Sequence, residues 1–251
     1  MIDGHCHLDR NIGGCEDAVC YLHGEAVNAG VKGVVLLNLP EIAFPNDDVI
    51  EATRRYGSFF SVFPALDPTQ SRPNALLERY RASGAVGLKL HPRLHNYKID
   101  DGWCVEVVRH AGRLNMAVMV DCFPDGNNLA LGNIPEAFMG LANKAPEARI
   151  AIGHAGGHRI MDALMIAKRF DNLYLDISYS LLYYRDSSVI NDIAYVVKSM
   201  NGKRIFWGTD YPDRPYPDSV RFSRNELERM DLTEFQLDTV LHNTVGEFLR
   251  L

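Results

Sequence analysis

Two histidines, His5 and His7, lie in the opening stretch IDGHCHLD, which reads as a β-strand. Residues at positions i and i+2 of a strand point to the same face, so both imidazoles can approach one ion from the same side. Neutral imidazole is a common ligand of divalent transition metals. Because paired histidines at this spacing also occur by chance, the pair indicates a metal site only if other ligands converge on it.

A second group of ionisable residues lies in and just after the segment GLKLHP. Lys89 and His91 share one face of this strand-like segment, and Leu88 and Leu90 share the other. The leucines suit contacts with covering helices, which leaves the lysine and the histidine pointing inward, where an unpaired charge is costly. With Arg93 they form a cationic group that suits a substrate carboxylate, although Arg93 could equally be a solvated loop residue.

Four further strand-like segments end in a carboxylate or a histidine. They are VMVDCFP with Asp121, IAIGHAGG with His154, NLYLDIS with Asp176 and IFWGTDYP with Asp210. By strand alternation, His154 shares the face of Ile152. Each of these residues has an ordinary structural interpretation, such as a turn for Asp210. Their common position at strand ends favours a shared metal site.

The elements that must position these residues alternate along the chain. Strand-like runs cover 1–7, 31–38, 59–65, 85–91, 117–122, 150–154, 172–178 and 204–210. Helical patterns cover 16–29, 47–56, 74–82, 100–114, 134–144, 158–170, 189–200 and 233–250. TEFQ at 233–236 has the spacing of a capping box, and Asn243 is a candidate cap of the last turn.

Eight strands separated by helices predict a parallel sheet closed into a (β/α)8 barrel, with the active site at the carboxyl ends of the strands. A doubly wound open sheet is the alternative, but no GxGxxG follows the first strand. No linker or low-complexity stretch divides the 251 residues, so we expect one domain over 1–251.

Composition excludes several classes of partner. The net charge is −6, which disfavours nucleic acid. No apolar run approaches about 18 residues and no secretory leader is evident, so we expect no membrane association. Five cysteines without paired spacing indicate a reducing compartment, so we expect a cytoplasmic protein.

The ordered motifs DGHCHL, GLKLHP, IGHAGG and WGTDYP resemble the amidohydrolase superfamily, in the branch of aminocarboxymuconate semialdehyde decarboxylase and related lactone hydrolases. The tail LDTVLHNTVGEFLRL resembles the closing helix of that branch, including Asn243. The resemblance implies a (β/α)8 barrel, and it implies that dimers are possible.

Carried over to this sequence, the resemblance makes His5 and His7 metal ligands, His154 a catalytic residue, and Asp210 both a ligand and a proton acceptor. Asp121 departs from the family pattern, which usually has a histidine at that place. A carboxylate there makes the site more anionic, and we predict a metal set of His5, His7, Asp121 and Asp210. One divalent ion is expected, with zinc favoured and Mn²⁺ or Fe²⁺ possible.

Two alternatives follow from the departure at Asp121. The site could lack a metal, as in metal-free lactone hydrolases, or it could hold two ions bridged by a carboxylated Lys89. The predicted substrate-binding residues are Lys89, His91, Arg93 and Asp176.

The leading hypothesis is hydrolysis of a small carboxylated lactone, ester or amide. A metal-activated water would attack the carbonyl, Asp210 would accept its proton, and His154 would stabilise the oxyanion or protonate the leaving group. The first alternative is non-oxidative decarboxylation of a small acid. The second is a barrel that binds a ligand without catalysis. A deoxyribonuclease on the same barrel is disfavoured by the acidic charge balance.

Overall fold

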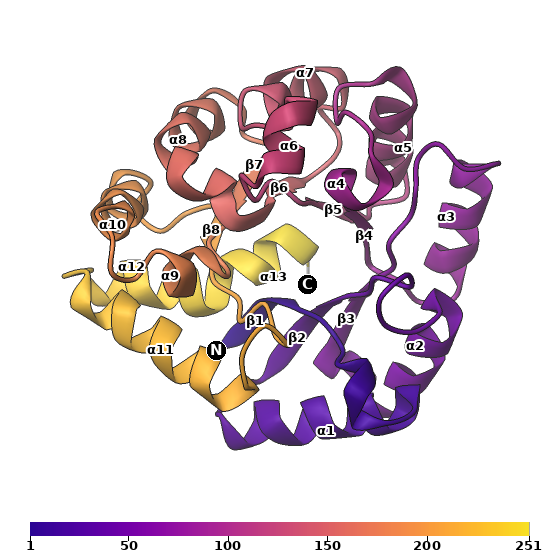
Figure 1. The fold of residues 1–251 in the computed structure, drawn as a ribbon, viewed down its shortest axis with the longest axis horizontal. Coiled ribbons are helices and arrows are strands. Elements are labelled where there is room, and N and C mark those ends of the chain that lie inside the picture. Colours follow the sequence, from indigo (N-terminus) through magenta and orange to yellow (C-terminus); the bar gives the residue numbers. More distant parts are fainter. Residues whose placement is uncertain (251) are drawn as a thin grey trace.

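The computed structural model describes residues 1–250 and consists of eight parallel strands ringed by helices (Figure 1). The strands are β1 (Ile2–Cys6), β2 (Gly33–Leu37), β3 (Phe60–Phe63), β4 (Gly87–Leu90), β5 (Ala117–Val120), β6 (Ile150–Ile152), β7 (Leu173–Asp176) and β8 (Ile205–Phe206). Each lies inside a segment that the sequence predicts as a strand. All the pairings are parallel, because a helical connection returns the chain to the same edge each time.

The strands form two sheets, β1–β2–β3 and β4–β8, that meet along two seams. At the first seam the Lys89 N–H donates to the Pro64 carbonyl at 3.0 Å. At the second, the Gly4 N–H donates to the Trp207 carbonyl at 3.0 Å and the Asp210 N–H donates to the His5 carbonyl at 2.9 Å. These hydrogen bonds connect the sheets into the predicted (β/α)8 barrel.

The helices form the outer layer of the barrel (Figure 1). The longer ones are α1 (Cys15–Asn28), α2 (Asn46–Thr53), α3 (Pro73–Ala82), α5 (Gly102–Arg113), α7 (Ala137–Lys144), α8 (Ile160–Arg169), α10 (Val189–Ser199) and α11 (Tyr216–Arg229). Short helices α4 (Pro92–His95), α6 (Gly126–Leu131) and α9 (Ser180–Tyr183) lie in loops that follow strands. The sequence patterns did not predict α11 or these three short helices.

The tail begins with the predicted capping box. The Thr233 hydroxyl accepts from the Gln236 N–H, and the Gln236 side chain accepts from the Thr233 N–H. Helix α12 (Glu234–Asp238) then continues through a π-helical turn into α13 (Thr244–Leu249). Asn243 precedes α13, but its side chain donates to Asp238 and does not cap the helix, so that expectation was wrong.

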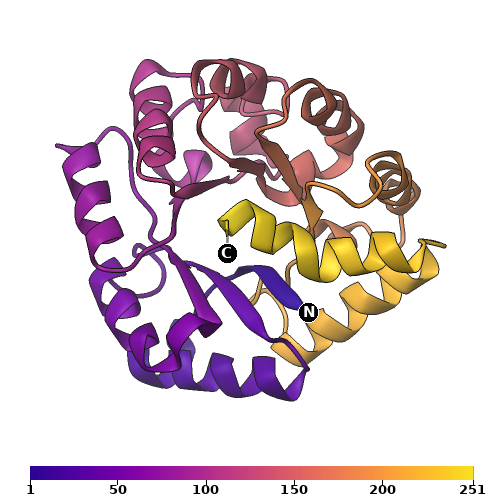
Figure 2. The same ribbon diagram turned by 180° about the vertical axis from the view of Figure 1, so that it is seen from behind.

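Helix α13 fills the barrel at the end where β5 and β6 begin (Figure 2). Phe248 packs in the interior cluster with Phe63, Phe206 and other inward residues of the strands. The Arg149 Nε, just before β6, donates to the Phe248 carbonyl at 2.6 Å. The polar strand ends lie at the opposite end, because parallel strands all place their carboxyl ends on one side. No helix among residues 1–250 is both long enough and apolar enough to span a bilayer.

Candidate metal centre

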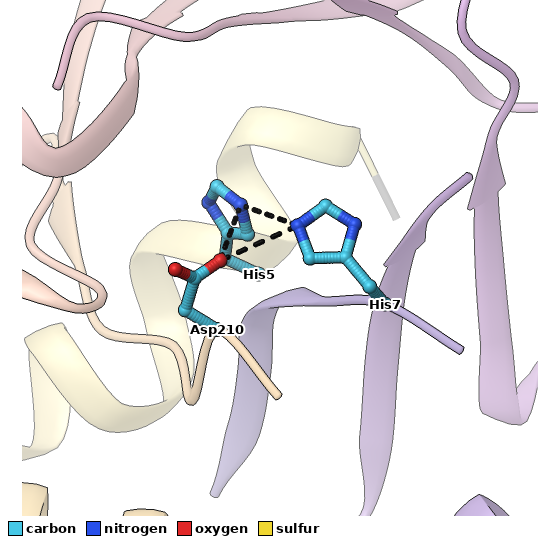
Figure 3. A group of neighbouring side chains, drawn as sticks. All are labelled: His5, His7 and Asp210. Atoms are coloured by element: carbon cyan, nitrogen blue, oxygen red, sulfur yellow. Dashed lines mark hydrogen bonds and ion pairs between the residues drawn. The ribbon is translucent and has the colours of Figure 1, made fainter. Parts of the chain in front are cut away.

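Three predicted ligand atoms converge at the carboxyl ends of β1 and β8 (Figure 3). His5 Nε2 lies 3.3 Å from His7 Nε2. Asp210 Oδ1 lies 3.1 Å from His5 Nε2 and 3.3 Å from His7 Nε2. We call His5, His7 and Asp210 the metal cluster.

The outer nitrogens of the two imidazoles have acceptor partners. His5 Nδ1 lies 2.6 Å from Asp176 Oδ2, and His7 Nδ1 lies 2.5 Å from the Leu37 carbonyl oxygen. A carbonyl or a carboxylate oxygen accepts a hydrogen bond, so each Nδ1 carries the proton in the neutral ring. Each Nε2 therefore presents a lone pair to the centre of the cluster, as metal-binding histidines do.

The metal cluster fits a divalent cation. Donors at about 2.0–2.1 Å from a tetrahedral zinc ion lie about 3.3 Å apart, which matches the donor spacing here. Burial and Lys89 lower the pKa of His5, but Asp176 and Asp210 outweigh them and raise it to about 9. Burial acts to raise the pKa of Asp210, yet His5 and His7 hold it well below its usual value. Both shifts show that the cluster attracts positive charge.

Asp3 is a buried residue that sequence reasoning missed. Its carboxylate accepts from the Thr209 hydroxyl at 2.6 Å, the Thr209 N–H at 3.0 Å and the His5 N–H at 3.1 Å. Burial raises its pKa to about 6. These bonds fix the loop after β8 to β1 and so bring Asp210, at a φ of 52°, beside His5. The available signal was an acid within the predicted first strand, two residues before His5.

His154 lines the cavity beside the cluster, although strand alternation placed it on the face of Ile152. Ile152 packs in the outer core, between the strands and the helices. The chain turns after β6, with His154 at a φ of 54°, and the imidazole reaches inward. Its Nδ1 lies 3.2 Å from the Ser178 carbonyl oxygen, and its Nε2 lies 3.4 Å from Asp121 Oδ1.

Asp121 lies outside the metal cluster and has its own partners. Its Oδ2 lies 3.1 Å from Arg93 Nε and accepts from Asn128 Nδ2 at 2.8 Å. Burial acts to raise its pKa, but the hydrogen bond from His154 and the charge of Arg93 hold it well below its usual value. Arg93 also donates to Asp125 at 2.8 Å. Asn128 and Asp125 were not anticipated from the sequence.

Asp176 lies behind His5 and not in the cavity lining. It is fully buried, and besides His5 it accepts from the Ser178 N–H at 2.9 Å and the Ser178 hydroxyl at 2.8 Å. These contacts make it the residue that orients His5. Its predicted contact with substrate stays a prediction that these contacts do not support.

A cavity of about 390 Å³ opens over the metal cluster. It brings together nearly all of the residues predicted for the site. Those that line it are His5, His7, Lys89, His91, Arg93, Asp121, His154 and Asp210. Residues of the loops after β1, β2 and β8 complete the wall, among them Arg10, Ile42 and Asp213. Its size suits a small organic molecule.

Comparison with known proteins gives a family and a fold. The model of a family described as Amidohydrolase matches residues 2–251. No match was found among curated protein sequences.

Three solved structures with similar folds illustrate the range of their described activities. An uncharacterised TIM-barrel protein from Bordetella bronchiseptica has a TM-score of 0.81 at 15% identity, covering 100% of this chain and 99% of that one. A probable 2-pyrone-4,6-dicarboxylic acid hydrolase from Acinetobacter baumannii has a TM-score of 0.72 at 15% identity, with the same coverage. The 5-carboxyvanillate decarboxylase of Sphingomonas paucimobilis has a TM-score of 0.67 at 15% identity, covering 91% of this chain and 82% of that one.

Proposed function

Because the chain belongs to the amidohydrolase family and is an enzyme of it, we propose that it hydrolyses a small carboxylated lactone, ester or amide with one divalent metal ion. The observation that carries this proposal is the metal cluster, in which three lone-pair donors lie 3.1 to 3.3 Å apart at the floor of a cavity. Zinc is the ion we favour, because two imidazoles and a carboxylate are typical zinc ligands.

His5, His7 and Asp210 would hold the ion, which when bound supplies a Lewis acid that activates water and polarises a carbonyl group. The sequence predicts Asp121 as the fourth metal ligand, but we assign it a different role. Its contacts with Arg93, Asn128 and His154 support a role in holding the cavity wall.

The side chains around the cluster divide the acid and base work. Asp210 turns Oδ1 toward the histidines, and its side chain is 17% exposed, so Oδ2 is available to accept a proton from the attacking water. His154 lies across the cavity with its ring centroid 4.9 Å from that of His5. From there it would stabilise the oxyanion or protonate the leaving group.

Replacement of the proposed base tests this function. D210N should abolish hydrolysis of carboxylated lactones and esters, with kcat/KM lowered at least about 10³-fold, since it loses both a ligand and the proton acceptor. The matched control is D213N, which removes a carboxylate from the same cavity wall outside the metal cluster. Mass spectrometry would measure the metal content of each variant. Circular dichroism would verify that each variant folds. Full activity in D210N would refute the proposal.

Decarboxylation is the second candidate, and the fold shared with 5-carboxyvanillate decarboxylase supports it. The metal cluster and Lys89, which lines the same cavity, would serve a substrate carboxylate in either reaction. Carbon dioxide release from carboxylated aromatic acids, without release of an alcohol or an amine, would favour decarboxylation over hydrolysis. We also propose a cytoplasmic location, because all five cysteines are free of disulfides.

A further inference from the structure

Lys89 is a buried cation that faces the cavity without a partner. It lies in β4, where its N–H forms the seam with the Pro64 carbonyl, and only 1% of the residue is exposed. Within residues 1–250, no carboxylate oxygen lies within 4.0 Å of its ammonium group, and no side-chain hydrogen bond holds it. Burial lowers the pKa of Lys89, while Asp121 and Asp210 act to raise it, so a bound anion that meets the ammonium group would stabilise its charged form.

Arg93, the neighbouring cation, is already engaged. Its Nε lies 3.1 Å from Asp121, and its Nη1 donates to Asp125 at 2.8 Å. Two carboxylates thus share one guanidinium group, so it has little positive charge left for a ligand. A substrate carboxylate at Arg93 would therefore lie close to two acids that repel it.

His91 provides a second unused polar group beside Lys89. Its Nδ1 is buried and has no hydrogen-bond partner, and its ring lines the same cavity. Burial lowers its pKa to about 3, so the ring is neutral. A neutral imidazole offers one N–H donor, which can complement the ammonium group of Lys89.

We propose that Lys89 and His91 form a subsite for a single carboxylate of the substrate, and that Arg93 holds the cavity wall and does not bind substrate. This inference rests on the proposed function and names the class of acid that the site takes. A monocarboxylate pairs with Lys89. A second carboxylate beside Arg93 would meet Asp121 and a guanidinium group that already pairs with two acids, and would be left without a partner of its own there.

Binding of small probes to the zinc-loaded protein tests the subsite. Titration calorimetry would compare butyrate, butyramide and succinate. We expect butyrate to bind at least tenfold more tightly than butyramide, and succinate to bind no more tightly than butyrate. K89M removes the charge and shortens the unbranched side chain by one atom, and should weaken butyrate binding about 10- to 100-fold, the effect of losing a charged hydrogen bond.

Control variants separate this subsite from general electrostatics. R10Q removes a cation from the exposed rim of the same cavity and should change butyrate binding less than twofold. K89Q serves as a second variant, and zinc content and thermal unfolding identify any variant that fails to fold. Three results would overturn the inference. The first is butyrate binding that K89M and K89Q leave intact, and the second is succinate binding that depends on Arg93. The third is the absence of butyrate binding by the wild type.

The outcomes also separate this inference from the proposed function. The protein could bind butyrate through Lys89 and yet hydrolyse no lactone, ester or amide. That result would support the subsite and contradict the proposed hydrolase function. Conversely, hydrolysis that is lost in D210N but unchanged in K89M would support the hydrolase and remove the subsite.

Discussion

The two imidazoles of the metal cluster are held by different partners. The carboxylate of Asp176 accepts from His5, whereas a backbone carbonyl, that of Leu37, accepts from His7. A carboxylate partner makes an imidazole a more basic ligand and fixes the orientation of its ring. His5 should therefore be the stronger of the two neutral ligands, and Asp176 should control metal affinity without touching the ion.

Substitution of Asp176 tests this division. D176N should weaken zinc affinity about 10- to 100-fold, because an amide is a poorer acceptor for the His5 N–H. Competition with a chelator of known affinity measures the effect. The matched control is D171N, which removes a fully exposed carboxylate just before the same strand, and its zinc affinity should equal that of the wild type. A folded D176N protein with unchanged affinity would contradict the assignment.

Residue types and spacing in the sequence predict most of the cavity lining. They placed His5, His7 and Asp210 at strand ends, and the structure brings their ligand atoms within 3.3 Å of one another. They did not anticipate how Asp121 pairs with Arg93. The pairing depends on two loops whose conformations are set by tertiary contacts, and no local pattern encodes it.

The elements were predictable where hydrophobic periodicity is strong. All eight strands lie in predicted segments, yet β8 ends at Phe206, well short of the predicted residue 210. After it the chain makes a positive-φ turn at Asp210, as it does at His154 after β6. Alternation patterns cannot describe such residues, because the turn redirects the side chain.

Helix α11 was missed for a different reason. Its buried face includes Ser219 and Ser223 beside Val220 and Leu227, so the apolar residues alone do not recur with a helical period. Pro217 lies in the first turn, where proline is favoured, and this was the available signal.

Helix α13 should contribute much of the stability of the barrel interior. F248A should lower the free energy of unfolding by about 3–5 kcal/mol, because it opens a cavity among the inward side chains of the strands. Denaturant unfolding measures the loss. The control is F235A on α12, where the ring is 54% exposed and its removal should cost less than about 0.5 kcal/mol. Equal effects of the two substitutions would show that α13 does not fill the interior as described.

In the whole molecule, the metal cluster spans the second seam of the barrel. His5 and His7 come from the first strand and Asp210 follows the last, so an ion bound there would link the two ends of the barrel. Metal binding and folding should be coupled, since the unfolded chain does not hold these donors together.

Metal removal tests this coupling. At a free zinc concentration of about 100 times the Kd, binding should add about 2.7 kcal/mol and raise the Tm by about 5–10 °C over the chelated protein. Differential scanning calorimetry measures the shift. The double variant H5A/H7A should show no such shift on addition of zinc. An identical Tm with and without zinc in the wild type would contradict a metal bound at the seam.

The position of the cluster also governs when it can form during synthesis. The ribosome makes Asp210 roughly 200 residues after His5, an interval of about 10–40 s at typical elongation rates. Until then a nascent chain lacks the carboxylate that completes the cluster. A chain truncated before Asp210 should therefore emerge without a full ion-binding site, and metal acquisition marks a chain in which the first and last strands of the barrel are both present.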